Sequence, residues 1–570
     1  MCRTGLILIS LLLAAAVATG AQPEVVAAEP MPGPGEEATA PDEGTGSVVE
    51  KIDIDLIDLE LLRGAVEGQI GAERIRLSLQ DCVCAALEAN EDIEVASYEP
   101  LKGAADILTA KGEFDPLAST TAVYMRATQE ASPEYKTFGQ IDAFEVYRTT
   151  TQTSVRGKLR WGTLYDATLG VDKEETTFNS YIEEWNTGLT LTLTQPLLRG
   201  RGKAVNVARI RLAKNARLMT DLQLKLVAMN TAAEAVKAYW DLVGAIEAVR
   251  VREESLANAE RLLEISQKRL EIGTGAALEV LQAKAGMATR QGDLLSARSR
   301  VADAEDVLKR LLNIRDAEMF SSKKVVPIDR PKVTEFTVED LQSMEQELDE
   351  SIELALQHRP EIQSGELEIA NAEIDRKRAA NDMLPDVQLT GTLYQGARDH
   401  YVSRAFTGLR ERTDNAYTVG LQASVPIGNR AARGAFQRAR LTQRQAEKKF
   451  EKTKQELMLK TRLAMRATRT SQILVESNRQ ARTLQEANVA AEEQRLRLGV
   501  STSFRVLQVQ EDLTLAQTQE VQTRIGYEKA LVELRLAEGT LLGGLGVEFE
   551  SPEPERPVTY LRSIHPPMPK

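Results

Sequence analysis

The side chains that could do chemistry are few in this sequence, and they are scattered. Histidine occurs three times in 570 residues, at His358, His400 and His565, with no spacing typical of a metal site. Cys82 and Cys84 lie two residues apart on a predicted helix, where their side chains point in different directions. We therefore expect two small buried side chains rather than a disulfide or a metal pair. The sequence predicts no catalytic, cofactor-binding or metal-binding residues, and hence no enzyme.

One glycine-rich segment, Gly200-Arg-Gly-Lys203, resembles a phosphate-binding loop only in composition. It lacks the spacing of that loop and the Ser or Thr that follows its Lys. It comes directly after an alternating strand-like segment, so we predict a strand-to-helix turn there.

The most distinctive local pattern is a glycine turn that occurs twice. Arg269-Leu-Glu-Ile-Gly273 is followed by Gly275 and by the apolar pair Val280-Leu281. Arg495-Leu-Arg-Leu-Gly499 is followed by Ser501 and by the apolar pair Val506-Leu507. Glycine allows the positive φ that reverses a chain after a helix. The pattern predicts two helical hairpin tips, each fastened below its turn by the apolar pair.

Glu279 and Arg505 occupy equivalent positions just after the two turns. One hypothesis is that they pair and hold adjacent hairpins together. The alternative is that both charges are solvated, in which case a pair would contribute only about 0–1 kcal/mol.

The two turns are part of a longer internal duplication, which also includes the helical and strand-like segments before each turn. Leu79–Ile93 matches Leu348–Ile362, Pro116 matches Pro385 at the same register, and Leu189–Pro196 matches Val419–Pro426. Landmarks repeated in one order predict a duplicated structural unit whose two copies pack side by side.

Each copy contains long helical stretches and short alternating strands. No proline occurs between Pro196 and Pro327 or between Pro426 and Pro552. Leu and Thr alternate through Leu189–Thr194, and the alternating runs have the length of a tilted membrane strand. Two strands per copy satisfy the pattern, and Val155–Val171 is a candidate for an additional hairpin beyond the membrane. Considered alone, the strands could also belong to the edge of a soluble β-sandwich. Considered alone, the helices could also form an isolated coiled-coil rod.

The predicted organisation divides the chain into seven parts. They are a signal peptide 1–21, a disordered leader 22–50, a segment 51–77, a first repeat 78–319 (strands within 117–195, long helix 203–272, return helix 277–317), a crossover 320–347, a second repeat 348–542 (strands within 386–426, long helix 430–498, return helix 503–542) and a flexible tail 543–570. Upper helices over 78–112 and about 348–381 complete the two copies.

Composition agrees with this organisation. Aromatic residues make up 5% and charged residues 27%, the balance of long solvated helices rather than of a thick globular core. The net charge of −13 has no basic block, so nucleic acid is not an expected partner. Arg3, the apolar run Leu6–Val17 and the small residues Ala18, Gly20 and Ala21 indicate an export signal, with a retained anchor as the alternative.

Together, Leu79–Ile93, Phe114-Asp115-Pro116, the segments around Pro196 and Pro426, and the two glycine turns resemble the outer membrane efflux protein family, of which TolC is a member. The resemblance spans about residues 78–542. It implies an α+β membrane protein: a homotrimer whose helices form a long α-helical barrel. A small equatorial domain would be formed by residues 51–77, by the crossover 320–347 and by the C-terminal tail 543–570. Each chain would add four strands to a 12-stranded transmembrane β-barrel.

The resemblance also implies a function. The protein would be a passive exit duct across periplasm and outer membrane, in a tripartite efflux pump or a type I secretion system. Its partners would be outer membrane lipid, a periplasmic membrane-fusion adaptor docked at the tips, and an inner-membrane pump. The alternative is a soluble periplasmic coiled-coil adaptor or spacer protein of an export complex.

Overall fold

The computed structural model describes residues 74–131, 143–177, 180–314, 324–331, 344–411, 414–550 and 561–563, with Pro133, Lys136 and Pro552. The predicted signal peptide, the leader and residues 51–73 of the equatorial segment lie outside the described residues. None of the described helices is long and apolar enough to cross a lipid bilayer.

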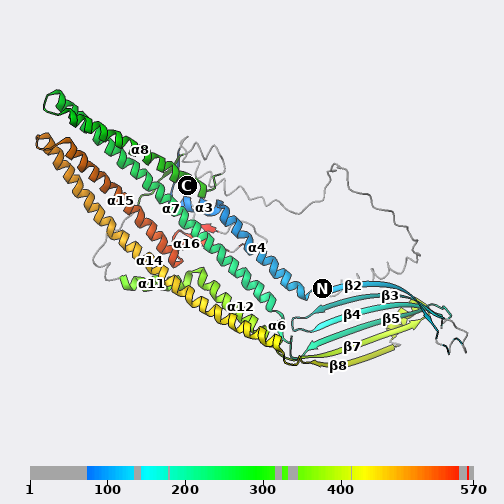
Figure 1. Ribbon diagram of the computed structural model, residues 1–570. Coiled ribbons are helices and arrows are strands. Elements are labelled where there is room, and N and C mark those ends of the chain that lie inside the picture. Colours follow the sequence, from blue (N-terminus) through cyan, green and yellow to red (C-terminus); the bar gives the residue numbers. More distant parts are fainter. Residues whose placement is uncertain are drawn as a thin grey trace, which may run out of the picture. The chain divides into compact units, whose positions relative to one another are not determined.

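Four columns of helices make up most of the described chain (Figure 1). The helices are α3 (Leu79–Ala89), α4 (Glu91–Lys111), α6 (Lys203–Asn206), α7 (Ala208–Glu271), α8 (Ala277–Leu311), α11 (Met344–His358), α12 (Pro360–Asp382), α14 (Arg430–Arg497), α15 (Ser503–Glu538) and α16 (Leu541–Gly544). The long helix α7 packs against α8 on one half of its length and against α3 and α4 on the other. The long helix α14 packs in the same way against α15 and against α11 and α12. Contacts of α7 with α15 and α12 join the two copies side by side.

The duplication is visible in backbone conformation. Each predicted upper helix is in fact two helices, because the chain is extended at Asn90 (φ −72°, ψ 125°) and at Arg359 (φ −71°, ψ 127°). Asn90 caps α4 by accepting hydrogen bonds from the backbone N–H groups of Asp92 and Ile93. Arg359 is extended because it precedes Pro360. Two different residues thus produce the same break at equivalent positions.

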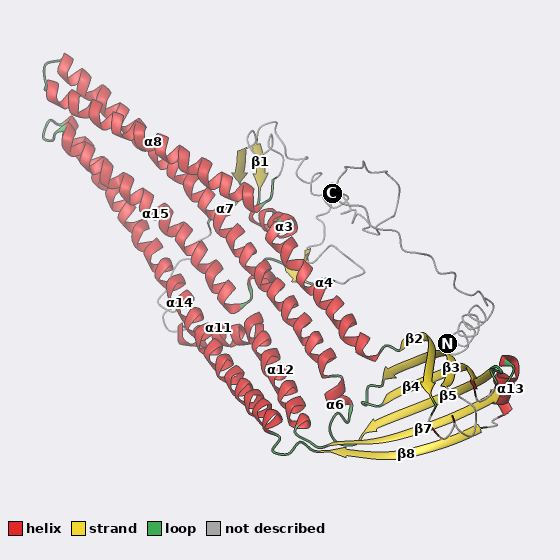
Figure 2. Ribbon diagram, turned by 45° about the vertical axis from the view of Figure 1, so that its right-hand side comes forward, coloured by secondary structure: helices red, strands yellow, loops and turns green. Residues whose placement is uncertain are grey.

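The strands form a six-stranded antiparallel sheet in the order β2-β3-β4-β5-β7-β8 (Figure 2). The strands are β2 (Leu117–Glu130), β3 (Ala143–Lys158), β4 (Leu164–Thr176), β5 (Glu184–Pro196), β7 (Asp386–Asp399) and β8 (Asp414–Ser424). The expected number of four strands is therefore wrong. The hairpin expected beyond the membrane at Val155–Val171 is instead formed by β3 and β4, two full-length strands of the same sheet.

The turn between β3 and β4 lies at the helical end of the sheet. Gly162 has a φ of +99°, and a Cβ there would come within 2.4 Å of the Gly200 carbonyl. The Trp161 carbonyl accepts a hydrogen bond from Gly202 N at 3.0 Å. Gly202 also caps α6, so the glycine-rich segment is the strand-to-helix turn that the sequence predicted.

The two faces of the sheet differ in charge. Residues paired across neighbouring strands project to the same face, so the register assigns every side chain to one of them. One face, called here the leucine face, is uncharged over Ala118–Tyr124, Thr149–Val155, Tyr165–Val171, Leu189–Leu193, Val387–Gln395 and Asn415–Ala423, taking alternate residues. On β3 and β4 the opposite face carries Arg148, Arg156, Asp166, Asp172 and Glu174. On β5, β7 and β8 it is uncharged over the same stretch and carries mainly Thr and Gln, among them Thr190, Thr192, Gln388 and Gln422. A short helix, α13 (Val402–Glu411), covers the leucine face at the end remote from the helices.

Described parts of the expected equatorial ranges pack around the middle of α7. Strand β1 (Arg74–Leu77) pairs in parallel with β6 (Lys324–Pro327), and β9 (Val547–Phe549) pairs with β10 (Leu561–Ser563). The main apolar core gathers Leu77, Val325 and Val547 against α7. Tyr239 of α7 is fully buried there, and its hydroxyl accepts hydrogen bonds from the Ile328 and Asp329 backbone N–H groups at 3.2 and 3.1 Å.

Candidate functional site

The turn between α7 and α8 forms the first hairpin tip. Gly273 has a φ of +81°, and its N–H donates to the Leu270 carbonyl at 3.0 Å. At Gly275 a Cβ would lie 3.0–3.1 Å from Arg269, so this glycine allows close approach to the preceding helix. The two glycines therefore have different roles: Gly273 allows the positive φ of the turn, and Gly275 allows the chain to pack closely against the preceding helix.

The turn between α14 and α15 forms the second tip. Gly499 has a φ of +77°, and Val500 N donates to the Arg495 carbonyl at 3.0 Å. Ser501, the counterpart of Gly275, donates its hydroxyl to the buried Glu492 carboxylate. A hydroxyl-to-carboxylate bond thus takes the place of the glycine contact of the first tip.

The apolar pairs below the two turns are not equivalent. Val506 is fully buried and packs with Leu262, Leu496 and the partly buried Leu507. By contrast, Leu281 is 65% exposed, and the fully buried residue below the first turn is Ala283. The prediction that Val280-Leu281 fastens its hairpin is therefore wrong for Leu281, because that side chain points away from the hairpin core.

Glu279 and Arg505 have other partners within one chain. The Glu279 carboxylate lies 3.9 Å from Arg269 Nη1, and it accepts a hydrogen bond from Ser503 Oγ at 3.5 Å. Arg505 Nη1 donates to Gln508 Oε1 at 2.8 Å. A Glu279–Arg505 pair between copies stays a prediction.

Polar contacts join the first tip to the second. Ser266 of α7 and Ser503 of α15 are both buried, and their hydroxyl oxygens lie 3.1 Å apart. Ser503 continues the chain of contacts to Glu279 of α8. The two hairpins, which come from different copies of the repeat, are thus held to each other close to their turns.

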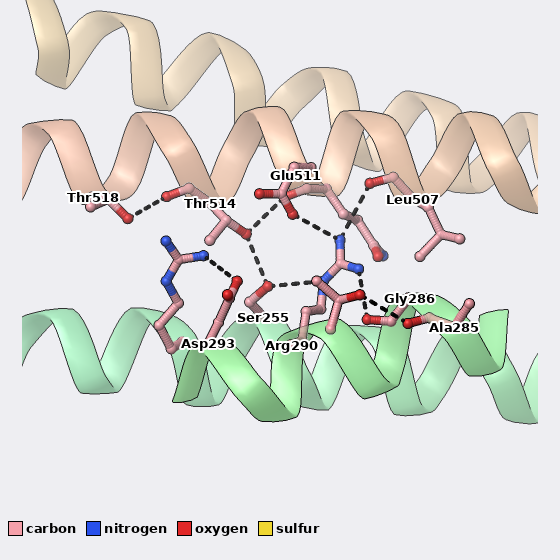
Figure 3. A network of polar contacts seen from close by, with 12 residues as sticks. Ser255, Ala285, Gly286, Arg290, Asp293, Leu507, Glu511, Thr514 and Thr518 are labelled. Atoms are coloured by element: carbon pink, nitrogen blue, oxygen red, sulfur yellow. Dashed lines mark hydrogen bonds and ion pairs between the residues drawn. The ribbon is translucent and has the colours of Figure 1, made fainter. Parts of the chain in front are cut away.

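A larger polar seam joins the hairpins about three turns of helix further from the tips (Figure 3). Arg290 of α8 is 5% exposed and points between α7 and α15. Its Nε donates to Ser255 Oγ at 3.1 Å, while its Nη2 lies 3.4 Å from both the Leu507 carbonyl and Glu511 Oε2. Thr514 Oγ1 donates to Ser255 Oγ at 3.1 Å. One buried guanidinium therefore contacts three helices.

The sequence did not single out Arg290, Ser255 or Thr514. Arg290 lies on a helix with many other charged residues, and nothing in its neighbours distinguishes it. Its burial depends on α15, a segment more than two hundred residues away. The one usable signal is Gly286, four residues earlier, since Leu507 would lie 3.0 Å from a Cβ at that position.

A groove separates the two tips on one side. It encloses about 500 Å³ and is lined by residues of α7, α14 and α15. Its lining includes Arg269, Gly499 and Val506 together with the basic residues Arg261 and Arg497. The groove therefore brings two of the predicted tip residues to one surface with a basic rim.

The cysteines behave as small buried side chains. Cys82 is fully buried, and burial raises the pKa of its thiol to about 12. Cys84 is half-buried, and burial likewise raises the pKa of its thiol. Both are free thiols. Within the described ranges, no group of three or more His, Cys, Asp or Glu residues could hold a metal ion.

Long helical hairpins continuing into a strand sheet with one uncharged face are the architecture of an outer-membrane channel protein. The sequence profile of the outer membrane efflux proteins matches residues 151–313 and 351–540. The chain belongs to this family. It is an efflux protein of the outer membrane that extends into the periplasm.

Solved structures share the fold at low sequence identity. The CmeC outer membrane channel of Campylobacter jejuni is 15% identical, with a TM-score of 0.55 over 81% of this chain and 86% of its own. VceC of Vibrio cholerae is 16% identical, with a TM-score of 0.56 over 81% and 96%. The open state of the MtrE channel of Neisseria gonorrhoeae is 16% identical, with a TM-score of 0.52 over 81% and 89%. No sequence among curated proteins matches the chain.

Proposed function

We propose that three copies of the chain assemble into the passive exit duct of a tripartite efflux pump or type I secretion system. The observation that carries the proposal is an exposed leucine stripe along α14. Leu441, Leu459, Leu463, Leu474 and Leu484 are 45–71% exposed. At about 100° per residue their spacing keeps all five within a sector of about 80°.

Such a stripe is the seam of a coiled coil without its partner helix. The helices α4 and α8 at the other edge of the slab also expose apolar side chains, among them Val95, Leu108 and Leu295. Each edge offers what the other requires, so a second copy of the chain is the partner that fits. Rotational repetition of this contact closes a ring.

The uncharged leucine face supports insertion of the sheet into lipid. A soluble adaptor or spacer, the alternative that the sequence left open, has no use for such a face. The opposite face, which is charged on β3 and β4 and carries mainly Thr and Gln on β5, β7 and β8, would line the aqueous side.

The tips are proposed as the entrance and as the dock for a periplasmic membrane-fusion adaptor. The groove beside Gly499 and Val506 can receive the tip of a partner hairpin, and its basic rim favours an acidic one. The inner-membrane pump would act through that adaptor. Glu279 and Arg505 are proposed to close the entrance by pairing between neighbouring copies.

The assembly is tested by charge introduced on the stripe. Leu459→Glu, at 55% exposure, should convert a detergent-solubilised trimer into monomers in a mass measurement, because it places a charge in the seam. Met458→Glu is the matched control, since Met458 is exposed on the same helix but lies about 100° away from the stripe. Wild-type protein that is monomeric, or that stays soluble without detergent, would refute the proposal. Dissociation by both variants would show that the stripe is not the seam.

A further inference from the structure

On each side the sheet ends in a long strand whose outer edge pairs with no other described strand. Strand β2 has 14 residues and β8 has 11, and they are the outermost strands of the six (Figure 1). Every residue of β8 is exposed, as are most residues of β2, whereas the inner strands are mostly half-buried. Long unpaired strands are templates for pairing with another chain.

We propose that β2 of one copy pairs with β8 of the next, so that three copies form a closed wall of eighteen strands. The inference rests on the proposed trimer, and it differs from the twelve strands that the family resemblance implies. Neighbouring strands alternate in direction across all six, so β2 and β8 run in opposite directions. Copies related by rotation therefore continue the antiparallel pattern without a break.

The β3–β4 hairpin raises the number of strands per chain from four to six. Contacts with the helices hold this hairpin in the wall. Its turn is held against the start of the long helix by the bond from Gly202 N to the Trp161 carbonyl. Lys158 at the end of β3 forms an ion pair at 2.7 Å with Glu113, which lies in the short 3₁₀ turn directly after α4. Strands anchored at the helical junction on both sides cannot be a loop beyond the membrane.

The leucine face continues to both edges, and this restricts the register between copies to alternate residues. On β8 this face carries the odd-numbered residues Tyr417, Val419 and Leu421, and on β2 the even-numbered Thr120, Ala122 and Tyr124. A slip of one residue would reverse one strand relative to the other. Pairing must therefore join odd residues of β8 to even residues of β2.

The expected radius of an eighteen-stranded wall also agrees with that of the ring of helices. Eighteen strands about 4.8 Å apart and tilted by about 40° give a wall radius of about 18 Å, against about 12 Å for twelve strands. Four helix columns per chain in three copies, about 10 Å apart, give a ring of radius about 19 Å. An eighteen-stranded wall meets this ring without narrowing, and it leaves a wide water-filled lumen lined by the face opposite the leucine face.

Disulfide formation between copies tests the pairing. In a protein with Cys82→Ser and Cys84→Ser, Val419→Cys is combined with Thr120→Cys, Ala122→Cys or Tyr124→Cys on β2. At least one pair should give covalent dimers and trimers on a denaturing gel. Combination with Thr121→Cys or Val123→Cys, on the opposite face, should give none.

Ala167→Cys on β4 is the control that distinguishes a wall of eighteen strands from a wall of twelve. Ala167 lies on the leucine face of an inner strand, so Val419→Cys should not reach it. Cross-linking to Ala167→Cys would mean that β2 and β3 lie outside a twelve-stranded wall, and would overturn the inference while leaving the trimer intact. A trimer by mass in which no pair cross-links, or in which only the odd β2 positions do, would also overturn it. A monomer by mass would refute the proposed function itself.

Discussion

Replacing Arg290 by Met should loosen the two hairpins from each other while leaving the fold intact. Met keeps the apolar stem between α7 and α15 and removes only the guanidinium, which is buried and donates to Ser255 at 3.1 Å. The seam would lose its connection between the three helices near the tips. We expect the tips to separate more often.

The magnitude follows from the contacts. A hydrogen bond from a charged donor is worth about 1.5–3 kcal/mol. The ion pair with Glu511, a residue whose side chain is 57% exposed, adds only about 0–1 kcal/mol. Removing the guanidinium also removes the cost of burying it, which offsets part of the loss. A net loss of about 2 kcal/mol corresponds to about a 30-fold shift in the opening equilibrium.

Hydrogen exchange of the amides of α8 and α15 near the tips measures this shift. In Arg290→Met they should exchange about 30-fold faster wherever exchange requires separation of the hairpins. Arg298→Met, on the same helix, is the control, because Arg298 pairs with Glu253 at 3.0 Å with both side chains more than half exposed. Equal exchange rates in the two variants would refute the idea that the seam holds the tips together.

Two further predictions concern the entrance and the buried thiol. Glu279→Ala combined with Arg505→Ala should raise single-channel conductance in planar bilayers if these residues pair between copies, and an unchanged conductance would remove that hypothesis. The Cys82 thiol has its pKa raised from 9.0 to about 12 in the folded chain, so the unfolded chain releases this proton first as pH rises. Stability measured by denaturant unfolding should therefore fall between about pH 9 and pH 12 more steeply in the wild type than in Cys82→Ala, and parallel curves would contradict this.

The duplicated architecture could be predicted because its repeated positions are either buried apolar residues or glycines that the backbone conformation requires. Val83 and Ile352 are buried at equivalent positions, and so are Ile93 and Ile362. Gly273 and Gly499 adopt the positive φ that their position after a helix requires. Such features follow from local chemistry and are visible in a single sequence.

The number of strands could not be predicted, because the additional hairpin hides its alternation. On β3 the leucine face carries Thr149, Thr151 and Thr153, and the opposite face carries Thr150, Gln152 and Ser154. Side chains of nearly the same polarity on both faces remove the period of two that indicates a strand. The polar seam was missed for a different reason: which arginine is buried depends on a helix from the other copy of the repeat.

In the proposed barrel, the helix α13 would set the height of the lipid-facing band. Thr187 donates a hydrogen bond to the Ala405 carbonyl at 3.0 Å, and Gln395 donates to the Leu409 carbonyl, so the helix closes the leucine face at one end. Between Val387 and Gln395 the strand rises about 27 Å, or about 21 Å after a tilt of about 40°, slightly less than the apolar height of about 25 Å of outer-membrane barrels. The outward side of α13 is polar and includes Arg404 and Arg410. A short polar surface helix would thus limit how far the sheet can enter the lipid. Lengthening the strands beneath it would change how far the protein extends out of the bilayer.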